Sequence, residues 1–159
     1  MNTARIDDVC DYVIARTIAG DAELNLLKLQ KLLYYVQAWH LAFHGEPLFA
    51  GRFQAWVHGP VNREIYVRFK GTKSLYSDVT EADVRPDFDA ERTLQPSARS
   101  HIDSVLETYA QYTGTQLEEM THREHPWLAA RAGYKPSERC ESEIDEKHMA
   151  QFYRARLST

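Results

Sequence analysis

Cysteine is scarce in this sequence, and no stretch of it is apolar enough to cross a membrane. Its two cysteines, Cys10 and Cys140, fall short of the disulfide framework that stabilises small secreted domains. The most apolar stretch, residues 24–43, is interrupted by charged and amide side chains. Residues 1–11 carry several charges instead of the apolar run of a signal peptide. We therefore expect a cytoplasmic protein without a membrane span.

Glycine-rich loops and nucleophile signatures are also missing, which argues against an enzyme. The seven glycines are scattered through the chain, so no loop of the kind that cradles phosphates is present. No serine or cysteine stands in a local pattern that would activate it as a nucleophile. We expect no catalysis, no cofactor and no small-molecule substrate.

Paired histidines are the feature that raises the question of a metal. His40 and His44 are one helical turn apart, and His122 and His125 form a second close pair. Zinc is bound at such spacings, but the glutamate that a zinc protease places between its helical histidines is missing here. We therefore expect no metal site, and a metal-dependent hydrolase stays the weaker alternative.

The composition is that of an ordinary globular protein with a slight excess of acidic residues. Of the 159 residues, 43% are apolar and 26% charged, which suits one domain over residues 1–159 with one hydrophobic core. The net charge of −4 argues against affinity gained by neutralising nucleic-acid phosphates. A local basic group still motivates a second alternative, a DNA-binding regulator of its own operon; the group is Arg63, Arg68, Lys70 and Lys73. We expect no DNA binding by this chain alone.

Apolar spacing predicts a mainly α fold, a compact helical bundle around a central apolar helix at residues 26–44. Apolar side chains cover nearly the whole circumference of this helix, which is typical of a helix packed on several sides. Asn25 is its expected N-cap, and Gly45 stands at its end. Alternation with a period of two predicts a short β-hairpin or strand pair near residues 48–58. Pro60 is then expected in the first turn of the next helix.

The second half is predicted to begin with an acidic loop and to continue in helices. Periodicity fades over residues 77–96, where acidic residues outnumber basic ones, so we expect a mobile connection in which a short strand or functional segment could still lie. The helix that follows is expected to end at Gly114, and Thr115 with Glu118 has the form of a capping box. The chain is expected to end in a helix.

The tryptophans leave two interpretations open. Each lies near a histidine, in the pairs Trp39–His40, Trp56–His58 and His125–Trp127. Aromatic side chains dominate both cores and interfaces, so these residues indicate either core packing, with imidazole groups satisfying buried acceptors, or a groove for a partner segment.

Several separated motifs, taken together, resemble the Panacea domain, the family of SocA-like antitoxins and phage-associated GepA-type proteins. The resemblance runs from about Ile6 to about Tyr153. The residues that carry it are Leu29-Gln30-Lys31-Leu32-Leu33-Tyr34-Tyr35, Trp39-His40-Leu41, Ala55-Trp56-Val57-His58-Gly59-Pro60-Val61, Tyr66, Phe69-Lys70, Thr121-His122, Pro126-Trp127 and Ala130-Arg131.

The resemblance implies a bacterial antitoxin, usually encoded beside its toxin, whose single domain neutralises that toxin by direct binding. One branch of the family is similar to a proteolytic adaptor, which holds a SocB-type toxin and delivers it to the ClpXP protease by contacting the ClpX unfoldase. The chain termini and the acidic segment 77–96 are candidates for that second contact. The candidate partner-binding residues are those of the motifs: Gln30, Lys31, Tyr34, Trp39, His40, Trp56, His58, Gly59, Pro60, Tyr66, Lys70, His122, Trp127 and Arg131.

Overall fold

The computed structural model describes residues 3–157 and confirms a mainly α fold with a two-stranded antiparallel sheet. None of the described helices is long and apolar enough to cross a membrane. The elements follow the chain in this order: α1 (Ile6–Ala19), α2 (Leu26–His44), β1 (Phe53–Trp56), β2 (Gly59–Asn62), α3 (Arg63–Phe69), the 3-10 helix η1 (Glu81–Asp83), α4 (Ala90–Thr93), α5 (Pro96–Tyr109), α6 (Gly114–His122), α7 (His125–Ala130) and α8 (Glu146–Arg156).

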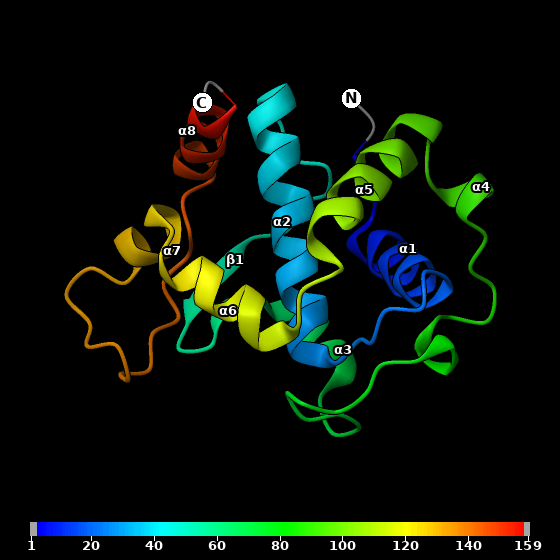
Figure 1. Cartoon of the computed structure of the whole chain (residues 1–159), viewed down its shortest axis with the longest axis horizontal. Helices are drawn as coiled ribbons and strands as arrows, with labels where there is room; N and C mark the ends of the chain where they lie inside the picture. Colours follow the sequence, from blue (N-terminus) through cyan, green and yellow to red (C-terminus); the bar gives the residue numbers. More distant parts are fainter. Residues whose placement is uncertain (1–2, 158–159) are drawn as a thin grey trace.

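Helix α2 is the axis of the fold, as its apolar circumference predicts. Figure 1 shows it running through the middle, with α1 and α5 on one side and α6, α7 and α8 on the other. The Asn25 side chain accepts a hydrogen bond from the Lys28 amide at 2.8 Å, so the expected N-cap is confirmed. Gly45 ends the helix in the left-handed conformation, with φ of 72°, and donates its N–H to Leu41 O.

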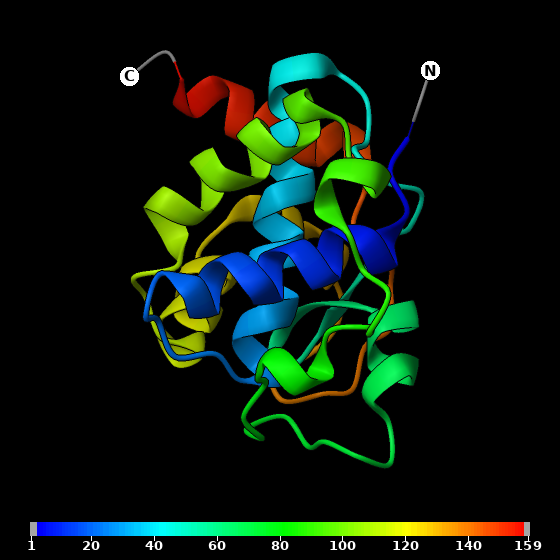
Figure 2. The ribbon, with the colours of Figure 1, turned by 90° about the vertical axis from the view of Figure 1, so that its right-hand side faces the viewer.

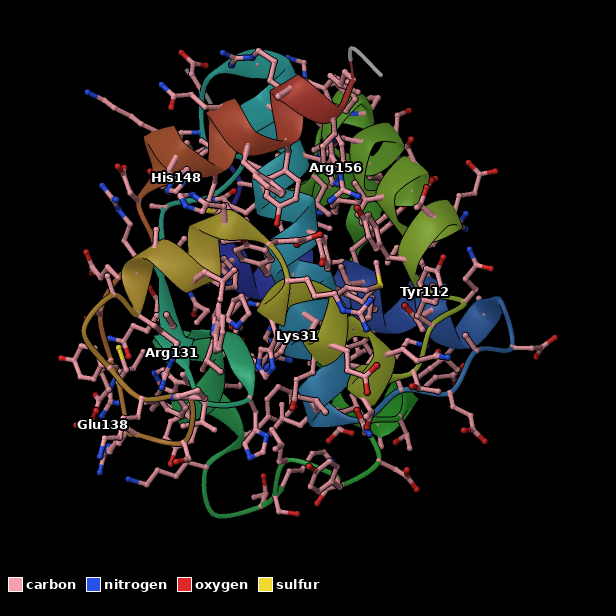
Figure 3. All side chains as sticks on the ribbon, turned by 60° about the vertical axis from the view of Figure 1, so that its left-hand side comes forward. Lys31, Tyr112, Arg131, Glu138, His148 and Arg156 are labelled. Atoms are coloured by element: carbon pink, nitrogen blue, oxygen red, sulfur yellow. The ribbon has the colours of Figure 1, made fainter. Side chains whose placement is uncertain are left out.

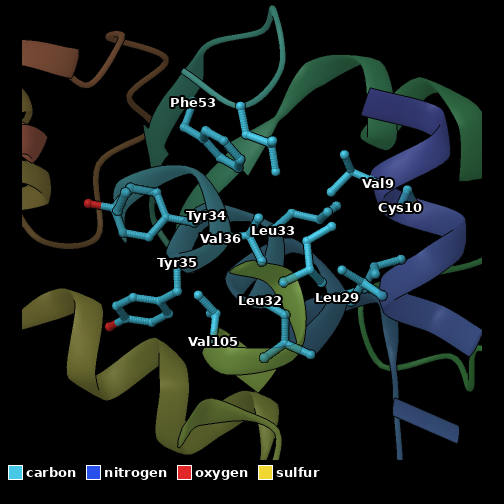
Figure 4. Close-up of a cluster of buried hydrophobic side chains, with 14 of the residues drawn as sticks. Val9, Cys10, Leu29, Leu32, Leu33, Tyr34, Tyr35, Val36, Phe53 and Val105 are labelled. Carbon is cyan, nitrogen blue, oxygen red and sulfur yellow. The ribbon is translucent and has the colours of Figure 1, made fainter. Parts of the chain in front are cut away.

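The core gathers around α2 because each face of this helix meets a different neighbour. In Figure 4, Leu29 and Leu33 lie on the side of α2 that faces Val9 of α1, whereas Val105 of α5 lies on another side, between Leu32 and Tyr35. Helices α1 and α5 cross in front of α2 in the turned view of Figure 2. A helix that is apolar nearly all round is stable only when several elements cover it, and that is the arrangement found here.

The β-hairpin lies slightly later in the chain than its alternation predicts. Strands β1 and β2 pair from Phe53 with Asn62 to Trp56 with Gly59. The expected start of a helix at Pro60 is therefore wrong, because Pro60 lies inside β2 and the Asn62 side chain caps α3 instead. Proline is tolerated in β2 because this is an edge strand, where the missing backbone N–H of proline costs no hydrogen bond between strands.

Two predicted helix boundaries are also wrong, both near Gly114. This residue lies in the first turn of α6, whose capping box is formed by Thr113 and Gln116 and not by Thr115 and Glu118. A Cβ atom at Gly114 would lie 3.0 Å from Asn25 Oδ1 and 3.1 Å from the Lys28 amide nitrogen. Glycine is needed here for the close approach of α6 to the start of α2, and no local rule reveals that need.

The acidic segment 77–96 is ordered against α1 and contains η1 and α4, so the expectation of a connection without helices is wrong. Its apolar residues Val79 and Leu94 are buried in the core. Arg85 pairs with Asp8 and, through Nε at 2.6 Å, with Asp11 Oδ2. Burial and ion pairing together fix a segment whose composition alone suggests mobility.

Candidate functional site

The motif residues Gln30 and Lys31 of α2 close the outer edge of the hairpin. The Gln30 amide accepts from Asn62 N at 2.8 Å and donates to Asn62 O at 3.1 Å, so it pairs with β2 as a neighbouring strand would. Lys31 Nζ donates to Pro60 O at 3.0 Å. The opposite edge is covered as well, because Ala55 N donates to Ser142 O and Ile144 N donates to Phe53 O. The sheet therefore offers no long open edge to another strand.

Lys31 lies in the interior between α6 and the hairpin (Figure 3) and is completely buried. Burial lowers the pKa of its amino group from 10.5 to about 7, and the charge of Glu118 partly opposes this shift. Gly59 makes room for the lysine side chain: its φ is +102°, and a Cβ atom there would lie 2.5 Å from Lys31 Cε. The need for glycine at position 59 thus comes from a lysine that is distant in the sequence.

Helices α6 and α7 support the turn of the hairpin from the other side. His58 Nδ1 lies 3.1 Å from Glu118 Oε1, and the His122 ring stacks on Trp127 at 4.2 Å between centroids. The Trp127 indole donates to the carbonyl of Trp56 at 2.9 Å. Of the two interpretations of the tryptophan–histidine pairs, core support therefore holds for Trp127, which is buried.

Arg131 holds the loop after α7 through backbone carbonyls alone. Its guanidinium donates to Ala55 O at 2.8 Å, to Lys135 O at 2.9 Å and to Glu138 O at 2.5 Å. The side chain is buried, while Glu138 lies out on the loop (Figure 3). The motif arginine thus ties β1 to the loop, and burial keeps its guanidinium group away from a ligand.

Four of the predicted residues meet at an open groove of about 380 Å³ beside the hairpin: Gln30, Trp56, Tyr66 and Lys70. The Trp56 and Tyr66 rings meet edge to face, with centroids 5.0 Å apart. Lys70 follows the end of α3 and is exposed. The groove combines an aromatic pair, an apolar floor and a cation, which is the composition of a site for a segment of protein.

Three other predicted residues lie away from this groove, farther along α2. Tyr34 is buried, with its hydroxyl 3.1 Å from that of Tyr153, and the Trp39 indole donates to the Tyr109 hydroxyl at 2.8 Å. His40 Nδ1 lies 2.6 Å from the carbonyl of Glu46. The structure therefore does not bring all the motif residues together, and this second group belongs to the packing of α5 and α8 on α2.

A buried carboxylate that the sequence analysis missed lies beside this second group. Glu124 Oε1 accepts from the hydroxyls of Tyr35 at 2.8 Å and Tyr153 at 2.6 Å, and Oε2 accepts from Arg156 at 2.9 Å. Burial raises the pKa of Glu124, while its hydrogen bonds to the tyrosines and the charge of Arg156 act in the opposite direction. No local pattern marks this residue, because its partners lie at residues 35, 153 and 156.

The histidines whose rings contact one another form two separate groups. The His40 ring lies 4.5 Å from that of His44 and 5.1 Å from that of His101 between centroids, whereas His125 pairs with His148 of α8 at 2.7 Å between Nδ1 and Nε2. Among the described residues, no group of three histidine, cysteine or carboxylate side chains is arranged to hold a metal ion. The predicted pair of His122 and His125 does not form, since the His122 ring stacks on Trp127 while His125 contacts His148.

The basic group at α3 is largely neutralised in the structure. Arg68 pairs with Asp7 and Asp11, Arg63 with Glu141, and Lys73 with Asp83. Within residues 3–157, Lys70 has no carboxylate within ion-pair distance. A phosphate backbone would thus meet one uncompensated cation here, which gives little of the electrostatic affinity that DNA binding requires.

Comparison with known proteins relates the chain to a family of antitoxins. The family model described as "Antitoxin SocA-like, Panacea domain" matches residues 29–128. Antitoxin SocA of Caulobacter vibrioides is 29% identical to the chain over 124 residues, which cover 75% of the chain and 66% of that protein. The chain thus spans slightly less than two thirds of this relative's length. No solved structure matches the chain.

Proposed function

The chain belongs to the family described as Antitoxin SocA-like, Panacea domain, and from this premise we propose that it is the antitoxin of a bacterial toxin–antitoxin system and neutralises a cognate toxin by binding it. The observation that carries the proposal is the extent of the family match. Residues 29–128 include most of α2, the hairpin, α3 and much of the support from α6 and α7. The matched region therefore contains every residue that lines the groove except Leu26.

The geometry around the hairpin supports a role in binding rather than in catalysis. The motif residues Gln30, Lys31 and Arg131 are buried and bonded to backbone groups, so their main role is to support the surface around the hairpin. Trp56 and Tyr66 are the motif residues that present aromatic surface to the groove. Fixed support beneath an aromatic surface is typical of protein recognition sites.

A finer form of the proposal is that the antitoxin works as an adaptor in the cytoplasm, holding a SocB-like toxin and delivering it to the ClpXP protease. This form requires two contacts, one for the toxin and one for the ClpX unfoldase, and tethering raises the effective concentration of the toxin at the protease. The acidic segment 77–96 is our candidate for the ClpX contact. Asp87, Asp89 and Glu91 are exposed on its outer side.

Expression of the neighbouring open reading frame tests the antitoxin proposal. We expect this frame to arrest growth when induced alone and to be harmless when the chain is co-expressed. A version of the chain with Leu33→Asp, which places a charge in the core, is the matched control and should give no rescue. The proposal would be contradicted if the neighbouring open reading frame is harmless when induced alone, or if growth arrest persists when the wild-type chain is co-expressed.

The same assay in a host without ClpX separates the two forms of neutralisation. Direct blocking of the toxin predicts rescue in both hosts. Delivery to ClpXP predicts rescue only where ClpX is present. Loss of rescue in the ClpX-free host therefore supports the adaptor, whereas unchanged rescue excludes it and leaves the antitoxin proposal intact.

A further inference from the structure

The groove beside the hairpin leads to an inference that rests on the proposed function and deepens it. We propose that this groove is the toxin-docking site and that it receives an apolar segment of the toxin with an adjacent carboxylate. The apolar side chain lies against Trp56 and Tyr66, over a floor made by Leu26, Val61 and Leu75. The carboxylate pairs with Lys70.

The walls of the groove are fixed in place before any partner binds. The Leu27 amide donates to Leu75 O at 2.9 Å and the Leu26 amide to Ser77 O at 3.2 Å, so the loop that forms one wall is tied to the start of α2. The opposite wall is tied through the bond from the Trp127 indole to Trp56 O. Binding therefore orders few groups of the antitoxin, which lowers the entropic cost of association.

The charge of the groove specifies the acidic character of the partner. The start of α2 cannot bind an anion, because its first amides already donate to Ser77 O, Leu75 O and the Asn25 side chain. Lys73, the other cation of the lining, is occupied by Asp83 at 3.2 Å and by the carbonyl of Asp78. Among described residues Lys70 is left as the uncompensated cation of the lining, and a carboxylate beside the apolar segment complements it.

The mode of docking follows from the closed sheet. The outer edge of β2 is already bonded to Gln30 and Lys31, so the toxin cannot bind by adding a strand there. Recognition must use side chains, and the rings of Trp56 and Tyr66 are the aromatic surface that the groove offers to them. Specificity then depends on matching one apolar side chain and one carboxylate of the toxin to this groove.

Binding of the intact toxin, made by cell-free synthesis from the neighbouring open reading frame, to purified antitoxin variants tests this inference. Biolayer interferometry should show that Tyr66→Ala and Lys70→Glu each weaken binding by about tenfold or more. The matched controls are Tyr134→Ala and Lys147→Glu, which remove an exposed tyrosine and reverse an exposed lysine away from the groove, and they should bind as the wild type does. Lys70 is exposed, so its variant should fold even if Tyr66→Ala is destabilised.

Charge reversal in the toxin identifies the paired carboxylate. We expect at least one Asp→Lys or Glu→Lys variant of the toxin to lose affinity for the wild-type antitoxin and to regain it for Lys70→Glu. Wild-type affinity of the Lys70→Glu and Tyr66→Ala variants, or the lack of any compensating reversal, would overturn the docking site while toxin binding itself stands. Absence of toxin binding by the wild type would instead refute the proposed function.

Discussion

Two buried ionisable side chains, Lys31 and Glu124, show how single residues hold this domain together. The buried amino group of Lys31 donates a hydrogen bond to the carbonyl of Pro60, and its pKa falls toward neutrality. Glu124 instead receives hydrogen bonds from three side chains. The first residue therefore ties α2 to the hairpin, and the second ties α2 to α8.

Lys31→Met should change the pH dependence of stability. In the folded protein Lys31 stays neutral down to about pH 7, whereas in the unfolded chain it is protonated below 10.5. As the pH falls through this window, the unfolded state binds a proton that the folded state does not, so the wild type loses up to about 1.4 kcal/mol per pH unit relative to the variant. Below about pH 7 the difference becomes constant.

Urea denaturation of both proteins between pH 7 and pH 9.5 measures this effect. The titrations of groups that do not interact with Lys31 cancel in the difference between the two proteins. The pKa of His122, which burial and, to a smaller extent, the charge of Lys31 lower from 6.5, lies below this pH range. A stability difference that does not change with pH over this range would show that the Lys31 amino group is charged in the folded protein.

Glu124→Ala should be strongly destabilising. It leaves the hydroxyls of Tyr35 and Tyr153 without their acceptor and removes a carboxylate that lies 2.9 Å from Arg156, which costs about 3 kcal/mol in the free energy of unfolding. The neighbouring exposed residue gives the control: Arg123→Ala should change stability by less than about 0.5 kcal/mol. Thermal unfolding followed by circular dichroism compares the two, and equal effects would refute a special role of the carboxylate.

At the scale of elements, the hairpin depends on contacts with several other parts of the fold. Its two strands of four residues each would be marginal alone. They are held by α2 at one edge, by residues 142–144 at the other, and by α6 and α7 at the turn. The hairpin should therefore form only together with the helices around it.

Gly59→Ala tests this dependence, with Gly71→Ala as its control. Both glycines have positive φ, +102° and +88°, so both substitutions carry a backbone cost of about 1–2 kcal/mol. Only at Gly59 would the new Cβ collide with Lys31, whereas nothing lies within 4 Å at Gly71. We expect Gly59→Ala to lower the free energy of unfolding by at least about 1 kcal/mol more than Gly71→Ala, measured in guanidinium chloride. Equal losses would mean that the lysine moves aside freely.

At the scale of the whole molecule, α2 connects the groove to the helices that pack around it. Its first turn forms part of the groove, and its middle packs on α1, α5 and α8. The acidic segment lies against α1, where Arg85 and Arg68 share the carboxylate of Asp11. Our proposals thus place the toxin contact and the ClpX contact on separate segments of the chain.

Neutralising the acidic segment should impair delivery without impairing toxin binding. Asp87→Asn with Glu91→Gln removes two exposed charges that make no ion pair within residues 3–157. In a reconstituted ClpXP assay we expect this variant to bind the toxin normally but to accelerate its degradation less than the wild type. Glu107→Gln with Glu143→Gln makes the same change in net charge elsewhere and is the control. Degradation unaffected by the first pair would refute the role of the segment.

The sequence by itself determined the features that depend on neighbours along the chain. The apolar circumference of residues 26–44, the N-cap at Asn25 and the glycine after His44 fix α2, because spacing and capping are local. The motif residues likewise indicated the family. Short-range rules failed at Pro60 and Gly114, where the conformation is decided by the approach of another element.

The tertiary structure alone decided what the polar residues of the motifs do and how the groove is formed. Gln30, Lys31 and Arg131 turned out to bond backbone groups of the hairpin and its loop, and the Glu124 network joins residues 35, 124, 153 and 156. The groove between Trp56, Tyr66 and Lys70 exists only once α2, the hairpin, α3 and the following loop meet. Such contacts depend on distances in space that no periodicity along the chain encodes.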